Sequence, residues 1–228
     1  MSEKIAVVTG AGTGVGRAIA EQLHEVGFKV ASIGRRKEKL DAAFGIAISC
    51  DVANEAEVKA MAQSVRQQLG TPRVLVISAG LNVPKRSLAE LSSDDFRKMI
   101  DVNLNGAFYC VREFLPMMRS AGGGTIVNII SDAGVQANAK AGGGYCASKF
   151  GLRGLTQTIN AEERANGIRA CSICPGDIDT PILELRPNPP SAEARKKMLR
   201  PEDVARCAML AIELPDRAIV EEILIRPK

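Results

Sequence analysis

The sequence predicts an α/β fold: a doubly wound parallel sheet of about seven strands with helices on both faces. Short β-branched apolar runs alternate along the chain with longer stretches of helical periodicity, the pattern of successive strand and helix units. Most of the short runs are apolar throughout, as expected for strands buried on both faces of a parallel sheet. Because 228 residues suffice for one sizeable core but are few for two, a single domain over 1–228 is expected.

The predicted elements follow one another in a regular order. Strands are expected over 5–8, 28–33, 46–50, 74–77, 125–130, 168–174 and 219–225. Helices are expected over 16–26, 54–69, 93–118 and 147–165. Gly27 follows the first of these helices, where a C-cap glycine would end it.

Residues 180–200 depart from this alternation. Pro181, Pro187, Pro189 and Pro190 precede a charged stretch. Because ligands bind beyond the carboxyl ends of parallel strands, an irregular segment after a late strand would lie over the binding crevice. Two interpretations stay open on these grounds: a substrate lid at about 180–200 and an ordinary surface excursion.

Charge and composition exclude several classes of function. There are 30 basic and 26 acidic residues, a formal charge of +4, and the longest basic run is Arg35-Arg36-Lys37. Such a balance is typical of a solvated surface, so neither nucleic acid nor a membrane is expected as a partner. The apolar segment before Thr9 has only about five residues, too few for a signal peptide or a membrane span, which predicts a soluble, cytoplasmic protein.

The six cysteines are scattered and are expected to be reduced. Cys171 and Cys174 form a C-x-x-C pair, a spacing that elsewhere binds zinc or forms a redox dithiol. Here the pair falls in a predicted strand, where positions three apart point to opposite faces. His24 is the only histidine, so no metal site is expected.

The turn after the first strand carries the first functional motif. The run Thr9-Gly10-Ala11-Gly12-Thr13-Gly14-Val15-Gly16 leads directly into a helix. Glycines allow a tight turn and a close approach to a pyrophosphate, whose charge the free N–H groups of the helix start stabilise. A plain strand-to-helix connection is the alternative. Since strand, turn and helix occur in the required order, dinucleotide binding is expected at Gly10, Gly12, Thr13, Gly14, Val15 and Gly16.

The end of the second predicted strand indicates which dinucleotide binds. An acidic residue there would accept hydrogen bonds from the ribose hydroxyls of NAD and repel a 2′-phosphate. This chain has Gly34-Arg35-Arg36 and no carboxylate. Guanidinium groups form charge-assisted contacts with phosphate, so Arg35 and Arg36 favour NADP over NAD. The alternative is an exposed basic helix start.

A second motif combines Tyr145 and Lys149 with Ser131, fourteen residues before the tyrosine. On a helix, Tyr145 and Lys149 share a face. A nearby cation lowers the pKa of a phenol, so Tyr145 is expected to act as a general acid and base. Ser131 would hold the substrate oxygen where charge develops. Singly, each residue has a structural explanation in packing, solvation or capping; their joint occurrence beyond a nucleotide loop indicates catalysis.

With these motifs, the chain resembles the short-chain dehydrogenase/reductase family, in its compact single-domain branch with a Rossmann fold. The family pattern T-G-x-x-x-G-x-G is matched by Thr9, Gly10, Gly14 and Gly16, and Y-x-x-x-K by Tyr145 and Lys149, with the catalytic serine at Ser131. The resemblance implies an NADP-dependent oxidoreductase that interconverts a small-molecule carbonyl and an alcohol. It also implies a homodimer or homotetramer.

Further site residues are implied only by this resemblance. Asn103 matches the asparagine that holds a water in a proton relay through the lysine. Asp51 and Val52 resemble the adenine-contacting pair, although Asp51 could simply cap the next helix. Ala79 and Gly80 fall on the family's stretch after the fourth strand. The loop that meets the nicotinamide carboxamide is matched by Pro175, Gly176, Ile178 and Thr180, although Pro-Gly is also an ordinary turn signal.

The chain departs from the family pattern in two places. Ser78 stands where the family has an asparagine, so that residue's sheet-stabilising hydrogen bonds must come from Ser78 or be absent. The stretch 35–45 is short and leaves little room for a full helix.

Three functions are compatible with the sequence: the oxidoreductase, a non-catalytic NADP-binding or cofactor-sensing protein, and an epimerase or dehydratase of the extended branch. The last normally carries a larger C-terminal domain, and only about fifty residues follow Pro175. Candidate substrate positions, mostly apolar or uncharged, are Val83, Gln136, Ala137, Ile182 and Leu183. Such residues would suit a hydrophobic ketone or an acyl-type substrate.

Overall fold

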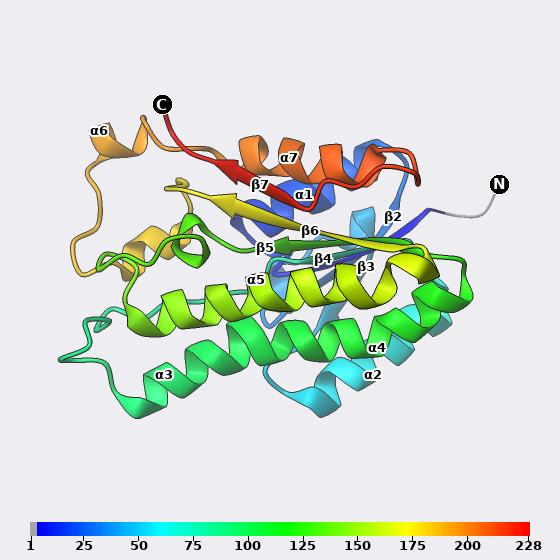
Figure 1. The fold of residues 1–228 in the computed structure, drawn as a ribbon, viewed down its shortest axis with the longest axis horizontal. Coiled ribbons are helices and arrows are strands. Elements are labelled where there is room, and N and C mark those ends of the chain that lie inside the picture. The colour runs from blue at the N-terminus through cyan, green and yellow to red at the C-terminus, as the bar shows by residue number, and fades with distance from the viewer. Residues whose placement is uncertain (1–3) are drawn as a thin grey trace.

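The computed structural model describes residues 4–228, in which seven parallel strands form one sheet. The strands are β1 (Ile5–Thr9), β2 (Lys29–Gly34), β3 (Gly45–Ser49), β4 (Val74–Ile77), β5 (Gly124–Ile129), β6 (Ile168–Pro175) and β7 (Glu222–Ile225). Their order across the sheet is β3-β2-β1-β4-β5-β6-β7, and every pairing is parallel (Figure 1). The predicted fold class is confirmed.

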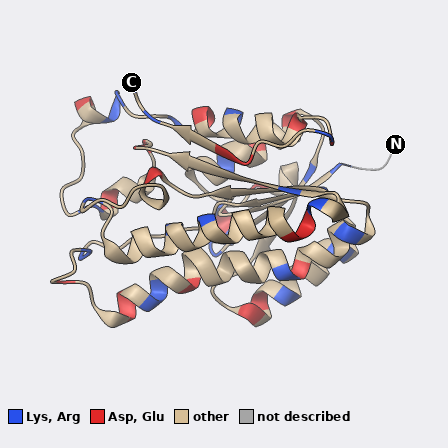
Figure 2. Cartoon of the chain, viewed as in Figure 1, with Lys and Arg blue, Asp and Glu red and all other residues tan. Residues whose placement is uncertain are grey.

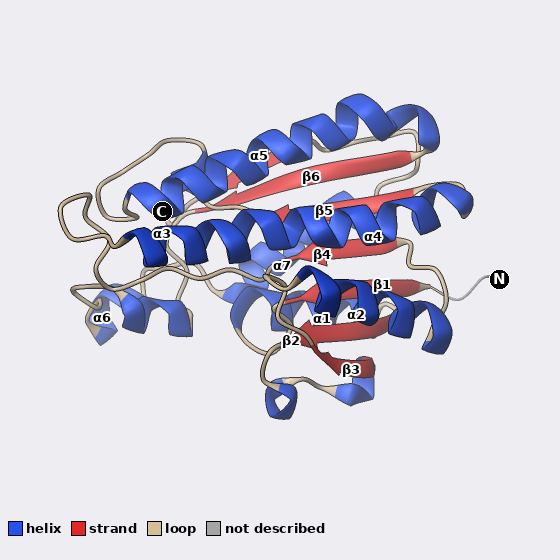
Figure 3. Ribbon diagram, turned by 90° about the horizontal axis from the view of Figure 1, so that it is seen from below, coloured by secondary structure: helices blue, strands red, loops and turns tan. Residues whose placement is uncertain are grey.

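Helices cover both faces of the sheet (Figures 1 and 3). They are α1 (Gly14–Glu25), α2 (Glu55–Gln68), α3 (Ser93–Ile100), α4 (Gly106–Ser120), α5 (Gly143–Glu163), α6 (Ala192–Arg195) and α7 (Pro201–Glu213). Apolar residues of α1 and α7 pack on one face of the sheet, and those of α2, α4 and α5 pack on the other. Charged residues are found mainly on the helices and in the loops, with few on the strands (Figure 2). No helix within 4–228 has the length and apolar character needed to span a membrane.

The cysteine pair of β6 divides between the two cores. Cys174 belongs to the cluster under α2, α4 and α5, and Cys171 to the cluster under α1 and α7. Both thiols are buried, and burial raises the pKa of Cys171 to about 12 and that of Cys174 to about 11. The predicted opposite orientation is confirmed, and the two residues act as core side chains.

Strand β3 corrects one expectation. Its residues Ile46, Ala47 and Ile48 are only partly buried, whereas the apolar run predicted burial on both faces. The reason is the connection from β2, which holds two short 3₁₀ turns, Lys37–Lys39 and Ala42–Phe44, in place of a full helix. The predicted shortness of 35–45 is confirmed, and it leaves this edge strand less covered than its neighbours.

The helix predicted over 93–118 is interrupted. Between α3 and α4, residues Asp101–Asn105 form a π-helical segment, in which Val102 and Asn103 are buried. A π-helical turn inserts an extra residue into the helix and often marks a functional position. At the start of α4, a Cβ atom on Gly106 would lie 2.8 Å from the carbonyl oxygen of Val52, so the glycine lets the helix approach the loop after β3.

All seven strands point their carboxyl ends to the same edge, where the long loops and α6 gather (Figure 1). The strand order reverses between β1 and β4, the position at which open α/β sheets bind ligands. Helix α5 begins at Gly143, earlier than predicted, since the run of three glycines before Tyr145 conceals the start of its helical pattern.

Candidate active site

The turn after β1 is held against the end of β4 by Thr9. Its Oγ1 accepts hydrogen bonds from the backbone N–H groups of Ser78 (3.1 Å) and Ala79 (3.2 Å). Gly10 has φ +69°, and a Cβ atom there would lie 2.8 Å from the Ala79 nitrogen. The sequence left open whether sheet-stabilising hydrogen bonds at this position come from Ser78 or are absent; in the structure the side chain of Thr9 links β1 to the residues after β4. Only glycine fits at position 10.

The N-terminus of α1 has the features of an anion-binding site. Gly14 has φ +56°, and a Cβ atom on Gly16 would collide with the carbonyl oxygen of Gly10, so helix and turn are in direct contact. No side chain caps the helix at Thr13, and its first turn holds no acidic residue. Unsatisfied N–H groups at a helix start, together with the helix dipole, bind phosphate. These residues fit the diphosphate of a dinucleotide.

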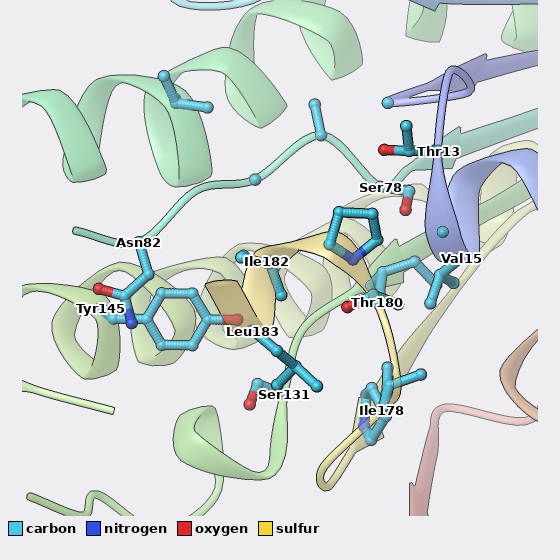
Figure 4. Close-up of a pocket in the computed structure, with 18 of the residues that line it drawn as sticks. Thr13, Val15, Ser78, Asn82, Ser131, Tyr145, Ile178, Thr180, Ile182 and Leu183 are labelled. Atoms are coloured by element: carbon cyan, nitrogen blue, oxygen red, sulfur yellow. The ribbon is translucent and has the colours of Figure 1, made fainter. Parts of the chain in front are cut away.

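A cavity of about 440 Å³ extends from this turn along the carboxyl edge of the sheet (Figure 4). Residues from both halves of the chain line it. Those predicted as site residues are Gly10, Gly12, Thr13, Gly14, Val15, Arg35, Arg36, Asp51, Val52, Ala79, Gly80, Ser131, Tyr145, Lys149, Pro175, Gly176, Ile178 and Thr180. Two predicted residues do not line it: Gly16, which packs on Gly10, and Asn103, which is buried behind the wall.

One end of the cavity is basic. Arg35, Arg36 and Lys39 line it where β2 ends, and all three are exposed. Asp51 lies on the same wall, with its Oδ1 accepting a hydrogen bond from the Ala53 N–H (3.1 Å). Asp51 does not cap α2, because Asn54 occupies that position and accepts from two backbone N–H groups. The alternative that Asp51 serves as the helix cap is therefore wrong.

Tyr145 and Lys149 lie one turn apart on α5, as predicted. The Lys149 Nζ is 5.7 Å from the centre of the Tyr145 ring and donates a hydrogen bond to the carbonyl oxygen of Ile129 (2.9 Å). Lys149 is buried at 3% exposure, and burial lowers its pKa to about 8. The lysine is thus held between helix α5 and the end of β5.

The pKa of Tyr145 differs from the sequence prediction. Burial raises it to about 12, and the negative charge of Asp132 acts in the same direction, while hydrogen bonding with Ser131 and the charge of Arg86 act in the opposite direction. The expectation that this pKa falls below its ordinary value is wrong for this structure, because desolvation of the phenolate outweighs the hydrogen bond with Ser131 and the charge of Arg86. The phenol is therefore in its protonated form at neutral pH.

Ser131 follows β5 and begins a 3₁₀ turn, Asp132–Gly134. Its Oγ accepts a hydrogen bond from the Ala133 N–H (3.2 Å) and donates one to Asp132 Oδ1 (3.3 Å). Figure 4 shows Tyr145 and Ser131 at the same end of the cavity, close to Ile182 and Leu183. Ser131 is both the cap of its turn and a hydroxyl presented to the cavity.

Asn103 holds the loop after β4. Its Oδ1 accepts a hydrogen bond from the Leu81 N–H (2.8 Å), and its Nδ2 donates to the Leu81 carbonyl oxygen (3.0 Å) and to Ser148 Oγ (3.0 Å). Asn103 Oδ1 and Lys149 Nζ both lie 3.5 Å from the point where a Cβ atom on Gly80 would stand. The π-helical segment thus places Asn103 beside the lysine, with its side chain bonded to backbone and serine.

The segment after β6 returns to the glycine turn. A Cβ atom on Gly14 would lie 3.2 Å from Thr180 Cγ2. Residues from Thr180 to Leu183, together with Arg186, line the cavity, and Leu183 is buried. Arg195 pairs with Glu184 and with Asp179 (3.4 Å), which ties α6 back to this segment. The beginning of 180–200 therefore forms part of the wall of the cavity.

The predicted substrate positions are only partly correct. Ile182 and Leu183 line the cavity, but Val83, Gln136 and Ala137 do not. The wall instead includes charged and amide side chains that the sequence analysis missed: Asn82, Arg86, Asn138, Lys140, Asp177 and Arg186. They lie on three loops far apart in the sequence, and no local spacing pattern marks them. The expectation of a mostly uncharged substrate wall is wrong.

The family model for short chain dehydrogenases matches residues 4–189. The chain belongs to this family. An uncharacterised oxidoreductase of Staphylococcus aureus (strain MW2) is 35% identical over 234 residues, covering 100% of this chain and 98% of the relative. A similar oxidoreductase of Staphylococcus saprophyticus is 34% identical over 238 residues, with the same coverage.

Solved structures of the family are similar throughout their length. An alcohol dehydrogenase from the archaeon Thermococcus sibiricus, complexed with 5-hydroxy-NADP, has a TM-score of 0.86 at 30% identity, covering 99% of this chain and 97% of that one. A closed form of serine dehydrogenase, complexed with NADP⁺, has a TM-score of 0.90 at 29% identity, covering 98% and 94%. The protein is an oxidoreductase of the short-chain dehydrogenase family. Within residues 4–228, no group of three or more His, Cys, Asp or Glu side chains has the arrangement of a metal site.

Proposed function

We propose that this protein is an NADP-dependent oxidoreductase that interconverts a carbonyl and an alcohol. One observation carries the proposal. Tyr145, Lys149 and Ser131 line the same cavity as the glycine turn of β1, so a dinucleotide at the turn would bring its reactive ring to the three side chains. The oxidoreductases that this chain resembles support the reaction class.

The residues divide the chemistry among them. The dinucleotide, when bound, supplies or accepts the hydride. Tyr145, protonated at neutral pH with a pKa of about 12, donates its proton to the substrate oxygen in the reducing direction. Ser131 donates a hydrogen bond to the same oxygen as negative charge develops. Lys149, whose Nζ donates a hydrogen bond to the Ile129 carbonyl oxygen, orients the cofactor ribose and returns a proton to Tyr145. Asn103 holds the loop at Leu81.

NADP is favoured by the charges at the β2 end of the cavity. Arg35, Arg36 and Lys39 line it there, and cations of this kind pair with a 2′-phosphate. A similar alcohol dehydrogenase is a complex with 5-hydroxy-NADP, a similar serine dehydrogenase is a complex with NADP⁺, and a similar polyketide ketoreductase is a complex with NADPH. These three enzymes differ in substrate but share the cofactor type, so they support NADP as the cofactor of this protein. The substrate has to be inferred from the residues that line the cavity.

The experiment is a titration of the purified protein with NADPH and NADH, followed by steady-state assays of cofactor oxidation with a panel of ketones, aldehydes and oxo acids. We expect turnover with NADPH, and a loss of about a hundredfold or more in kcat for Tyr145→Phe, with NADPH affinity unchanged. Tyr109→Phe is the matched control, since Tyr109 is the other tyrosine of the chain and lies on α4. Tight NADPH binding without oxidation by any carbonyl would favour the non-catalytic cofactor-binding protein instead.

A further inference from the structure

Arg86 is a buried guanidinium on the wall of the active-site cavity. Its residue exposure is 6%, although it lies in the loop between β4 and α3. Its Nε donates a hydrogen bond to the Val83 carbonyl oxygen (2.7 Å), and its Nη2 donates to the carbonyl oxygen of Leu185. The side chain is therefore held from both sides, by its own loop and by the segment after β6.

This cation has no acidic partner among residues 4–228. No carboxylate there lies within 4.0 Å of Arg86. Asp177, on the same wall, is occupied by Arg186 (2.5 Å) and Lys140. Burial and the neighbouring charge of Arg186 both lower the pKa of Arg86. A buried charge without a partner lowers the stability of the folded protein, so this arrangement favours the binding of an anion at Arg86.

One nitrogen of the Arg86 guanidinium, Nη1, has no protein partner among residues 4–228 and could bind that anion. Its Nε and Nη2 are bonded to protein, and Nη1 makes no hydrogen bond within the described part of the chain. The buried side-chain atoms without a partner in that part are Ser32 Oγ and Asn128 Oδ1. Arg86 Nη1 is not one of these fully buried atoms, so it keeps some solvent exposure, and the Arg86 residue lines the cavity.

Arg86 belongs to the catalytic end of the cavity. The charges of Arg86 and the Tyr145 phenolate interact, which is one of the influences on the pKa of both groups. Gly142, the N-cap residue directly before α5, has φ +83°, and a Cβ atom there would lie 2.7 Å from Arg86 Cβ. Arg86 thus packs directly on the first turn of the helix that carries Tyr145, on a different loop from the basic end formed by Arg35 and Arg36.

We propose that Arg86 binds a carboxylate of the substrate, so that the substrates are hydroxy acids and the corresponding oxo acids. This inference rests on the proposed oxidoreductase function. In the oxidising direction Tyr145 acts as the phenolate: the carbinol C–H bond breaks and its hydride passes to NADP⁺, the O–H bond breaks and its proton passes to the Tyr145 phenolate and then to solvent, and a carbonyl forms. The carboxylate is unchanged and serves only to fix the substrate against Arg86. A buried, charge-assisted contact of this kind discriminates strongly between an acid and its neutral ester.

A purely structural role for Arg86, as a clamp on the segment at Leu185, makes a different prediction. Loss of a clamp would weaken the turnover of acids and esters alike. Loss of a carboxylate ligand lowers the turnover of acids alone.

The experiment compares hydroxy acids with their methyl esters, with the hydroxyl on the second, third or fourth carbon, at saturating NADP⁺. For the wild type we expect at least one acid to exceed its ester in kcat/KM by about 30-fold or more. Arg86→Gln should abolish this preference by lowering kcat/KM for the acid and leaving that for the ester within about threefold, and Arg86→Lys should restore part of it. Arg66→Gln, an exposed arginine on α2, is the matched control and should change neither.

Binding of butanoate to the NADP⁺-loaded protein, measured by calorimetry, tests the same site without turnover. We expect saturable binding in the wild type and its loss in Arg86→Gln. Equal turnover of acids and esters by the wild type, or a preference for esters, would overturn the inference while the oxidoreductase function stands. If no alcohol or carbonyl reacts at all, the proposed function fails, and butanoate binding still decides whether the anion site exists. If Arg86→Gln does not fold, the wild-type preference and the Arg86→Lys variant decide the question.

Discussion

A hydrogen bond of 2.9 Å joins the Lys149 Nζ to the carbonyl oxygen of Ile129, at the end of β5. The lysine is almost completely buried, and burial lowers its pKa from the ordinary value of 10.5 to about 8. The position of Lys149 beside Tyr145 therefore lowers the free energy of unfolding, as is common for polar groups at functional sites.

Replacement of Lys149 by methionine should stabilise the protein below pH 8. The charged form is disfavoured in the folded state, so the penalty is fully present below the folded pKa of about 8 and disappears above 10.5. The shift corresponds to about 3 kcal/mol, from which the lost hydrogen bond to Ile129 subtracts about 1 kcal/mol. Denaturant unfolding of the wild type and of Lys149→Met from pH 7 to pH 10.5 measures the difference in their free energies of unfolding. A stability difference between wild type and variant that stays constant over this range would contradict it, and Lys59→Met on the exposed face of α2 serves as the control.

The raised pKa of Tyr145 predicts different pH profiles for the two directions of the reaction. Reduction needs the phenol, which is the form present below a pKa of about 12, so this group should leave kcat/KM for reduction flat from pH 6 to pH 10. Oxidation needs the phenolate, so its kcat/KM should rise with pH across the same range. Initial rates in both directions provide the measurement. A reduction rate that falls with a midpoint near pH 7 would show that Tyr145 has a much lower pKa.

Gly10→Ala should abolish dinucleotide binding and destabilise the fold, since the new Cβ would stand 2.8 Å from the Ala79 nitrogen at a positive φ. Gly27→Ala is a matched control, because Gly27 also has a positive φ (+88°) but has no atom within 4 Å of its Cβ position. We expect a cost of about 1 kcal/mol from backbone strain for Gly27→Ala, and clearly more for Gly10→Ala. Thermal melting with and without NADPH separates the two effects. Equal losses at both positions would rule out steric contact with the residues after β4 as the cause.

Arg35→Ala and Arg36→Ala should weaken NADPH binding more than NADH binding. Each removes one cation from the end of the cavity where β2 stops, and a charge-assisted contact to phosphate contributes about 1.5–3 kcal/mol, or roughly tenfold or more in Kd. Fluorescence titration with both cofactors, at low and at high salt, gives the ratio. If the affinities for NADPH and NADH fall by the same factor, the arginines do not contact the 2′-phosphate. Arg17→Ala, an exposed position on α1, is the comparison variant.

The elements with strong local patterns were predictable from the sequence. Strand β4 was found at its observed bounds, and the other strands within one to three residues at each end, because buried parallel strands are apolar throughout. The boundaries of α5 and of the helix around Asn103 were less well predicted. Glycines before Tyr145 conceal a helix start, and the π-helical turn at Asp101–Asn105 separates α3 from α4 within the apolar stretch 93–118.

The charged wall of the cavity was not predictable, and the loop that carries Arg86 shows why. Asn82 donates a hydrogen bond to the carbonyl oxygen of Ala141, 59 residues away, and Arg86 contacts a segment 99 residues away. Such contacts arise only when the strands have been ordered side by side, and nothing in a local window of sequence records them.

The sequence by itself determined the alternation of strands and helices, the glycine turn, and the one-turn spacing of Tyr145 and Lys149, because all three depend on neighbours within a few residues. Only the tertiary structure decided the environment of those groups: burial that raises the pKa of Tyr145, a lysine anchored on Ile129, and a buried Arg86 that faces the same cavity. Charge and desolvation depend on everything within several ångströms, whatever its distance along the chain.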